Sequence, residues 1–320
     1  MLEHPWYRVV AELTDAVTSL TSDFWRRRRV RNLHLPLTTG AVSSPMGLGS
    51  DSSPVAVTVG GVRTYLADSM QFLLEYGCRI FPAGCYYLMP SFRGEDADAT
   101  HLPQFFHSEA ELPGGLDDVV SAVEDYVAFL AQELLTDLGA QIAQIAGTLD
   151  HLDRLAEGGP LDRLTLDEAE RVLDGDPVFV RRDPVGFRAL TRAGERKLIE
   201  RAAGGFVWVT EMDHLGVPFY QAFADDDRRL ARNADLLFGV GETVGAGERH
   251  VDAASLDEAL ALHGVDAEHY SWYRTMKELH PLRTAGFGMG VERFLLWVLR
   301  HDDIRDIPLV LRFNRQSIEP

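Results

Sequence analysis

The feature that most constrains the fold is a pair of neighbouring runs, residues 85–95 and 104–112, joined by a short acidic segment. Each run is long enough for a strand, and the connection 96–103 allows them to pair as an antiparallel hairpin. Side chains alternate between the two faces of a strand, so one face of this hairpin is apolar and can pack on helices. The other face carries Arg93, Glu95, Phe105, His107, Glu109 and Glu111.

This charged face has two interpretations. A solvated sheet surface would also carry charges, and for an isolated hairpin that is the simpler interpretation. Arg93 in place of a lysine, and Phe105 among the charges, favour a ligand site instead. A planar guanidinium binds phosphate in bidentate fashion, and an aromatic ring stacks on a purine. The hairpin therefore suggests a nucleotide site.

Near the C-terminus, the stretch GFGMGVERF places three glycines before a helix that we expect to begin near Val291. Glycines allow the backbone to come close to a ligand, and Arg293 at the helix start can reach a phosphate or stack on a base. Tight packing of a strand on a helix would need the same glycines. The motif is a weak signal alone and gains weight from its pairing with the hairpin.

Two acidic residues in DLLFGVGETVGAGER predict a metal site. Asp235 and Glu242 lie seven residues apart, an odd step along a strand, so the glycines must interrupt the ladder if both carboxylates converge. Mg²⁺ prefers one or two carboxylates together with phosphate oxygens. Arg249, just beyond, is a candidate for holding a substrate carboxylate. A glycine-rich solvated loop is the alternative interpretation.

The other segments predict one domain, residues 1–320, of the α+β class, with a mainly antiparallel sheet flanked by helices. We expect an amphipathic helix within 5–31, a helix over 70–78 with Ser69 as its N-cap, and a helical region over 116–156. GGFVWVTEM and PFYQAF are predicted to be further strands.

Composition narrows the class of protein. A formal charge of −18 argues against a protein that holds nucleic acid mainly through phosphate contacts. We interpret the dense basic run at 26–29 first as a solvated helix end or a subunit contact. Two cysteines are too few for a disulfide framework, and the sequence predicts neither a membrane span nor a signal peptide. These features predict a cytoplasmic enzyme.

Together these motifs resemble class II aminoacyl-tRNA synthetases of the subgroup for aspartate, asparagine and lysine, and most closely the asparaginyl-tRNA synthetase family. FRGE…HLPQF…EAE is similar to motif 2, and GFGMGVERF…IRDIP to motif 3. YLADSMQFLLE resembles the amino-acid-binding segment, and GVGETVGAGER the metal and side-chain segment. After the N-terminal helix of residues 1–35, LPLTTG is a weak match to motif 1, the dimer-forming element.

The resemblance implies a homodimer that activates a carboxylate with ATP and Mg²⁺. Arg93 would bind the α-phosphate and Arg293 would cover one face of adenine, so both are predicted to be catalytic. The residues implied for ATP are Arg93, Glu95, His101, Phe105, Glu242, Gly290 and Arg293; for the metal, Asp235 and Glu242; and for the substrate, Ser69, Gln71, Glu75 and Arg249.

The sequence also departs from the family's pattern. The resemblance begins at the catalytic core, so we expect no anticodon-binding domain. The loop after Arg93 reads GEDADAT, without a basic residue, and should repel an RNA backbone. The glutamate that holds the α-ammonium in the family should fall near Pro45 or Met46, where none occurs.

These departures predict an asparagine synthetase-like ligase. It would activate aspartate or a close analogue, bound in reverse, as an acyl-adenylate and pass the acyl group to ammonia or a small amine, without tRNA. In that reversed pose Arg249 would bind the α-carboxylate and Glu75 the α-ammonium. The alternatives are a truncated asparagine– or aspartate–tRNA ligase, and a non-catalytic paralogue that binds ligand and regulates a partner. Glu75 could instead bind a carboxamide, as in the asparagine enzymes, and asparagine itself would then be activated.

Overall fold

A computed structural model describes residues 4–43, 52–225, 227–310 and 313–317. The central sheet comprises β1 (Arg31–Asn32), β5 (Cys85–Phe92), β6 (Gln104–Pro113), β7 (Arg163–Thr165), β10 (Val207–Thr210), β11 (Asn233–Phe238), β12 (Gly241–Glu248) and β13 (Thr284–Gly290). Its strand order is β1-β5-β6-β13-β12-β11-β10-β7. The outermost pairings, β1–β5 and β10–β7, are parallel and the inner ones antiparallel, which confirms the predicted α+β class.

The predicted hairpin forms, with β5 ending at Phe92 and the backbone N–H of Arg93 still donating to Pro103 O at 2.9 Å. The alternation of side chains puts Tyr86 into the main core, whereas Tyr87 packs with residues of the opposite face. On β6, the Ser108 hydroxyl lies 2.9 Å from the Tyr126 hydroxyl on the helix-covered face. Glu109 and Glu111 consequently point to the other face.

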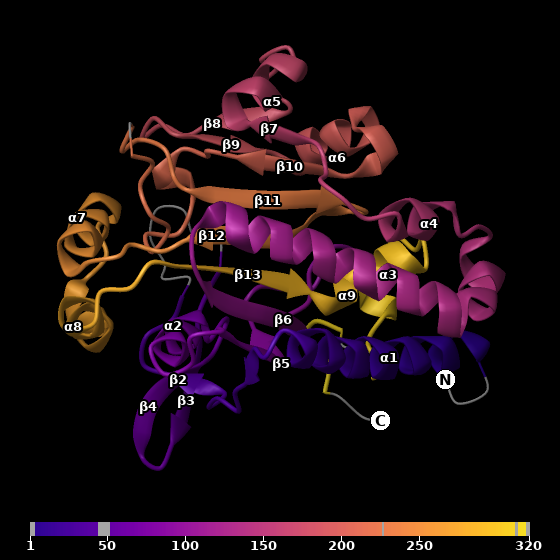
Figure 1. Ribbon diagram of the computed structural model, residues 1–320, viewed down its shortest axis with the longest axis horizontal. Helices are drawn as coiled ribbons and strands as arrows, with labels where there is room; N and C mark the ends of the chain where they lie inside the picture. The colour runs from indigo at the N-terminus through magenta and orange to yellow at the C-terminus, as the bar shows by residue number, and fades with distance from the viewer. Residues whose placement is uncertain (1–3, 44–51, 226, 311–312, 318–320) are drawn as a thin grey trace.

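Three helices cover the core face: α1 (Pro5–Arg27), α3 (Leu116–Ala146) and α9 (Val291–Val298) (Figure 1). Trp25 of α1 packs against Phe287 of β13 with ring centroids 5.9 Å apart, so these helices close the main core over the sheet. The helical region expected over 116–156 is divided, because Gly147 adopts a left-handed conformation (φ 77°) that ends α3. A short helix, α4 (Asp150–Ala156), follows.

The opposite face carries α2 (Gln71–Cys78), α5 (Leu166–Val172) and α6 (Arg192–Arg201). Two helices, α7 (Ala253–His263) and α8 (Ser271–Leu279), lie beyond one end of the central strands (Figure 1). A small sheet comprises β2 (Thr38–Thr39), β3 (Val55–Val59) and β4 (Val62–Leu66). The strand predicted in PFYQAF is wrong, since the structure has only isolated bridges there, Gln221 with Arg249 and Phe223 with Ala231. None of the described helices is long and apolar enough to cross a membrane.

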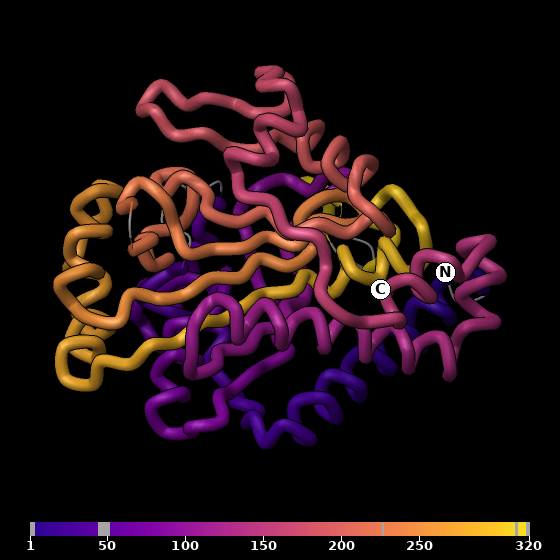
Figure 2. The backbone as a smooth tube through the Cα atoms, turned by 45° about the horizontal axis from the view of Figure 1, so that its top comes forward, coloured from indigo at the N-terminus to yellow at the C-terminus, as the bar shows by residue number. Residues whose placement is uncertain are grey.

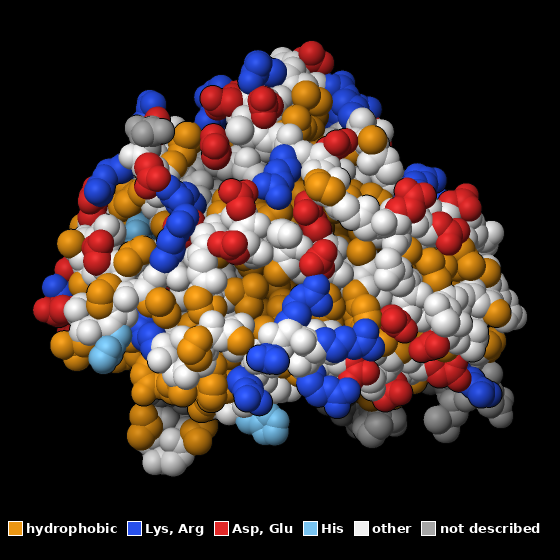
Figure 3. Space-filling model, in the orientation of Figure 1, with side chains coloured by type: hydrophobic (Ala, Val, Ile, Leu, Met, Phe, Trp, Pro, Cys, Tyr) orange, Lys and Arg blue, Asp and Glu red, His pale blue; other side chains and the backbone are white. Residues whose placement is uncertain are grey.

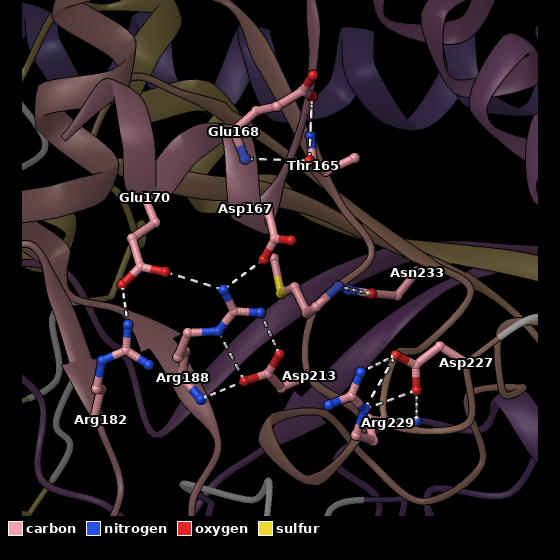
Figure 4. A network of polar contacts seen from close by, with 11 residues as sticks. Thr165, Asp167, Glu168, Glu170, Arg182, Arg188, Asp213, Asp227, Arg229 and Asn233 are labelled. Atoms are coloured by element: carbon pink, nitrogen blue, oxygen red, sulfur yellow. Dashed lines mark hydrogen bonds and ion pairs between the residues drawn. The ribbon is translucent and has the colours of Figure 1, made fainter. Parts of the chain in front are cut away.

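The hairpin of β8 (Val180–Arg182) and β9 (Arg188–Leu190) belongs to a segment that stands at one edge of the molecule (Figure 2). Arg188 holds this hairpin in place. Its guanidinium donates to Asp213 at 2.7 Å, to Asp167 at 2.5 Å and to Glu170 at 3.0 Å (Figure 4). The side chain is only 15% exposed, so these charge-assisted bonds fix the hairpin more firmly than surface pairs would.

On the face with α1 and α3, basic side chains gather near the C-terminal end of α1, with acidic side chains beside them (Figure 3). Arg28 pairs with Asp125 at 2.8 Å and Arg26 with Asp23 at 2.7 Å. These pairs support the interpretation of residues 26–29 as a solvated helix end.

Candidate active site

A cavity of about 700 Å³ opens on the sheet face that carries α2 and α6. Segments distant in the chain supply its walls, including β6, β12, β13, α2, α6 and the β8–β9 hairpin. The predicted site residues that line it are Ser69, Gln71, Arg93, His101, Phe105, Asp235, Glu242, Arg249, Gly290 and Arg293. Of the predicted set, Glu75 and Glu95 do not line the cavity.

Glycines of β13 form part of the floor beside the charged side chains of β6. In the antiparallel ladder Gly286 pairs with Glu111 and Gly288 with Glu109. A Cβ on Gly286 would collide with the Glu111 carboxylate, and a Cβ on Gly288 would lie 3.2 Å from Oε1 of Glu109. These glycines thus leave room for the β6 carboxylates to lie against the sheet.

One end of the cavity combines two arginines with an aromatic ring. The guanidinium carbon of Arg93 lies 5.5 Å from the centre of the Phe105 ring. Nε of Arg93 is buried and has no hydrogen-bond partner among the residues that the structure describes. Arg293, in the first turn of α9, donates to the backbone carbonyl of Glu242 and lies 3.0 Å from Nε2 of His101. This end therefore has donor capacity suited to a phosphate.

The loop after β5 is anchored to α6 at the same end. Nη2 of Arg192 lies 2.9 Å from Nδ1 of His101, and its Nη1 lies 3.2 Å from Oδ2 of Asp98. Burial and the neighbouring Arg293 guanidinium lower the pKa of His101. A neutral imidazole is thus favoured, so Arg192 and Arg293 supply the positive charge around it.

Three carboxylates converge beside these arginines. A Cβ on Gly245 would lie 2.7 Å from Oε1 of Glu242 and 3.7 Å from Oδ1 of Asp235, so the two predicted metal ligands face one point despite their odd spacing. A bulge between Leu236 and Leu237 provides the break in the ladder. Glu195, which the sequence did not predict, accepts a hydrogen bond from the Glu242 backbone N–H at 3.2 Å.

These acids share an unfavourable electrostatic environment. Burial, together with the Glu242 carboxylate, raises the pKa of Glu195 to about 7 and raises that of Asp235 well above its usual range. Within the described part of the chain, no group of three or more metal-ligating side chains forms a complete metal site. Two carboxylates with open positions fit Mg²⁺ brought by a polyphosphate, since that ion keeps water and phosphate oxygens as ligands.

The other end of the cavity is built on a buried ion pair. Nη2 of Arg249 lies 3.1 Å from Oε2 of Glu111, with the two side chains 4% and 0% exposed. Burial raises the pKa of Glu111, and the Arg249 guanidinium opposes that rise. Nη1 of Arg249 also lies 3.3 Å from Oε1 of Gln221. The end therefore presents both a donor and an acceptor.

Glu75 and Glu95 have other partners. Glu75 is fully buried, pairs with Lys277 Nζ at 2.7 Å and accepts a hydrogen bond from the Tyr273 hydroxyl at 2.6 Å. Glu95 accepts a hydrogen bond from the backbone N–H of Ser53. The Glu75 carboxylate is therefore satisfied within the protein, whereas Oε2 of Glu95 is buried and has no hydrogen-bond partner among the described residues. Pro45 and Met46, where we looked for an ammonium-binding glutamate, lie outside the described residues.

The middle of the β6 face contains residues that the sequence analysis noted but did not assign. The N-cap position of α2 is Met70, one residue later than predicted, but Oγ of Ser69 still accepts from the backbone N–H of Gln71 at 3.1 Å. Ser69 also donates from Oγ to Glu109 at 2.7 Å, and the Tyr87 hydroxyl donates to the same Glu109 oxygen at 2.5 Å. The second oxygen of Glu109 lies 2.9 Å from Nδ1 of His107. Strand alternation placed these side chains on the ligand face and was the signal available for finding them.

The fold agrees with the resemblance seen in the sequence. A sequence model of the family "tRNA synthetases class II (D, K and N)" matches residues 4–313, so the chain belongs to that family. The family consists of ATP-dependent, AMP-forming ligases that use Mg²⁺.

Relatives and solved structures give the same result. The chain is 30% identical over 252 residues to the asparagine–tRNA ligase of Xanthomonas campestris (strain 8004), covering 77% of this chain and 54% of that protein. It is 28% identical over 261 residues to a probable cytoplasmic asparagine–tRNA ligase of Encephalitozoon cuniculi, covering 79% and 56%. The chain thus spans about half the length of these curated relatives.

Asparaginyl-tRNA synthetase from Pyrococcus horikoshii, solved with asparaginyl-adenylate, superposes with a TM-score of 0.88 at 23% identity, over 99% of this chain and 71% of that one. The corresponding enzyme of Entamoeba histolytica, also solved with asparaginyl-adenylate, gives 0.83 at 21% identity, over 98% and 69%. At this identity the likeness establishes the fold.

Proposed function

We propose that this cavity binds asparagine and ATP with Mg²⁺ and joins them as asparaginyl-adenylate. A carboxylate oxygen of the amino acid attacks the α-phosphorus, and the bond to pyrophosphate breaks. The supporting observation is that one strand, β6, carries the aromatic ring of Phe105 at one end and the Glu111 partner of Arg249 at the other. The six steps from Phe105 to Glu111 span about 20 Å of strand, so a ligand extended along this face can contact both the ring and the ion pair.

The proposed roles follow from position in the cavity. Arg93, with its unpartnered Nε, would bind the α-phosphate, and Phe105 and Arg293 would flank adenine. His101 and Gly290 lie beside Arg293 and would contact the phosphates. Glu95, an ATP ligand by resemblance, keeps Oε2 without a hydrogen-bond partner among the described residues, so it could take part while Oε1 still accepts from Ser53. Asp235 and Glu242 would hold Mg²⁺, which when bound neutralises charge on the phosphates.

Asparagine is favoured over aspartate by the charge of the paired end. Arg249 and Glu111 together carry no net charge, so they match a neutral carboxamide, whose oxygen accepts from Arg249 and whose NH₂ donates to Glu111. The side-chain carboxylate of aspartate would instead lie beside the Glu111 carboxylate, and the two negative charges would repel each other. The pose that we predicted for reversed aspartate needs Glu75 near the α-ammonium, but Glu75 is already neutralised by Lys277. Ser69 and Gln71 remain the proposed contacts of the backbone groups of the amino acid.

For the acceptor we propose tRNA, because the relatives are named asparagine–tRNA ligases. The same proposal includes a homodimer and a cytoplasmic location. The word cytoplasmic is part of the name of the Encephalitozoon cuniculi relative. The comparisons give no support to the predicted transfer to ammonia. The non-catalytic alternative is disfavoured, since arginines and acids suited to ATP line the cavity together.

A small amine remains the second candidate acceptor because of one observation. The loop after Arg93 carries Glu95, Asp96 and Asp98, and the positive charge near it is engaged, with Arg192 bound to Asp98. Such a loop repels an RNA backbone and attracts an ammonium ion.

Two assays test the proposal. ATP–pyrophosphate exchange should depend on asparagine and Mg²⁺, and exchange with aspartate alone would overturn the assignment of the amino acid. AMP release from enzyme, ATP and asparagine should then be stimulated by an asparagine tRNA transcript. Stimulation by ammonium chloride and not by the transcript would favour the second candidate.

A further inference from the structure

His107 is an ionisable residue in the middle of the cavity that has no role in forming an adenylate. It lies on β6 between Phe105 and Glu109, with its ring edge-on to that of Phe105 at a centroid distance of 4.7 Å. Across the ladder it pairs with Gly290, whose missing side chain leaves room for the Arg293 side chain, 3.8 Å from where a Cβ would lie. One two-residue step along a strand is roughly 7 Å. His107 therefore lies between the proposed adenine platform and the Arg249–Glu111 pair, along the path that a bound adenylate would take.

Its neighbours hold the ring in one tautomer. Nδ1 lies 2.9 Å from Oε1 of Glu109 and 3.0 Å from Oγ of Ser91. Although burial alone would raise it, the pKa of Glu109 is lowered by His107, Ser69 and Tyr87, so this carboxylate stays ionised and accepts. The proton of a neutral imidazole is thus placed on Nδ1. Nε2 has no hydrogen-bond partner in the described part of the chain and is available as a base.

We propose that His107 is the general base of the transfer step. Resting on the proposed function, the step begins with the enzyme-bound asparaginyl-adenylate. The acceptor's O–H or N–H group attacks the acyl carbon, a new C–O or C–N bond forms, and the bond from the acyl carbon to the phosphate oxygen breaks. AMP leaves with that electron pair, and Nε2 takes the proton of the nucleophile. Glu109 acts as the positioning residue that orients the ring and stabilises the imidazolium.

The charges around His107 suit this role. Glu109 contacts the ring directly, and its negative charge favours the imidazolium. Arg93, just after β5, and Arg293, on α9, line the same cavity, and their positive charges disfavour the imidazolium. β13 presents Gly290 to His107, and β5 presents Met89, neither of which is charged.

The test separates transfer from activation in one protein. Asparagine-dependent pyrophosphate exchange reports activation, and single-turnover decay of preformed asparaginyl-adenylate with an acceptor reports transfer. His107→Gln should lower the transfer-to-exchange ratio by roughly 10²- to 10⁴-fold, the usual contribution of a general base. His301→Gln is the matched control, because His301 also contacts a carboxylate, Asp306 at 2.8 Å, but lies outside the cavity lining. It should leave the ratio unchanged.

Three further results decide the proposal. Wild-type transfer should rise with pH to a plateau, whereas transfer by His107→Gln should have no such plateau. Imidazole added to His107→Ala should restore transfer but not alter exchange. Arms with an asparagine tRNA transcript and with ammonium chloride identify the acceptor. An unchanged ratio in His107→Gln with whichever acceptor works, or the absence of rescue, would overturn the proposal. Loss of exchange in the wild type would instead overturn the proposed function.

Discussion

The two ends of the cavity handle buried charge in opposite ways. At the amino-acid end, Arg249 pairs with Glu111 and Lys277 pairs with Glu75, all four side chains being at most 4% exposed. At the other end, among the described residues, no ion pair involves Asp235, Glu195 or Glu242, and the pKa values of Asp235 and Glu195 are raised by burial.

The difference separates a finished site from one that is completed by its ligand. Buried charges are tolerated when a partner and hydrogen bonds compensate them, which the paired end achieves within the chain. At the acidic end the buried carboxylates have no positively charged partner, so their desolvation is not compensated within the chain. A cation bound with ATP would compensate it. The part of the site that selects the amino acid would therefore be formed before binding, whereas the site for metal and phosphate would be completed only when ATP and Mg²⁺ bind.

The largest expected effect comes from breaking the paired end. Arg249→Met should lower the free energy of unfolding by about 3–5 kcal/mol, because it leaves the Glu111 carboxylate buried without a partner. It should also abolish asparagine-dependent exchange. Urea unfolding measures the first effect.

The matched control is Arg274→Met, which removes an arginine that pairs with Asp257 at 2.8 Å while 41% exposed. It should cost at most about 1 kcal/mol, as surface pairs do. Similar losses in both variants would show that the paired end is not special.

A second expectation concerns pH and the other end. Glu292 lines the cavity there, and burial raises its pKa to about 7, against an ordinary value of 4.5. The unfolded chain releases this proton first as pH rises, so Glu292 should cost stability progressively between pH 4.5 and 7. Glu292→Gln should match the wild type at pH 4 and exceed its unfolding free energy at pH 8, by on the order of 3 kcal/mol. Parallel curves of unfolding free energy against pH would contradict the shift.

The third expectation tests the phosphate end without disturbing the fold. Arg93→Ala should lower the exchange rate by about 10²- to 10³-fold, the usual effect of losing one preorganised charge-assisted contact in a transition state. Its urea midpoint should stay close to that of the wild type. Arg8→Ala, on the exposed side of α1, is the control and should retain full exchange. Equal exchange rates in the two variants would show that Arg93 is not part of the ATP site.

The smallest effect should appear in the dependence on metal. Glu242→Gln removes one of the two proposed Mg²⁺ ligands and should raise the Mg²⁺ concentration for half-maximal exchange by about tenfold, or about 1.4 kcal/mol. Calorimetry should detect tight Mg²⁺ binding only in the presence of ATP. Strong binding to the ATP-free protein, unaffected by the substitution, would mean that the acidic end is already complete without a nucleotide.

The sequence predicted the parts of this site that follow from local regularity. Strand alternation placed Arg93 and Phe105 on one face, and the glycines before Val291 correctly marked the start of α9. Both signals extend over only a few residues, so the alternation of side chains and the position of glycines can be seen directly in the sequence.

The long-range pairings at both ends of the cavity could not be predicted in this way. Lys277 contacts Glu75 across 202 positions in the chain, and Glu195 reaches the Glu242 backbone across 47. No local period predicts which distant helix supplies a partner, so Glu75 was interpreted as a substrate ligand and Glu195 was missed. Burial, which decides both assignments, emerges only from the tertiary packing.

The central claim is that both ends act as one site for asparagine and ATP, and the binding of a non-hydrolysable asparaginyl-sulfamoyl-adenosine tests it most directly. Calorimetry should show one site per chain that binds the asparaginyl compound at least about tenfold more tightly than its aspartyl counterpart, since only the neutral carboxamide matches the Arg249–Glu111 pair. Arg93→Ala should weaken both compounds. Equal affinities, or tighter binding of the aspartyl compound, would contradict the account.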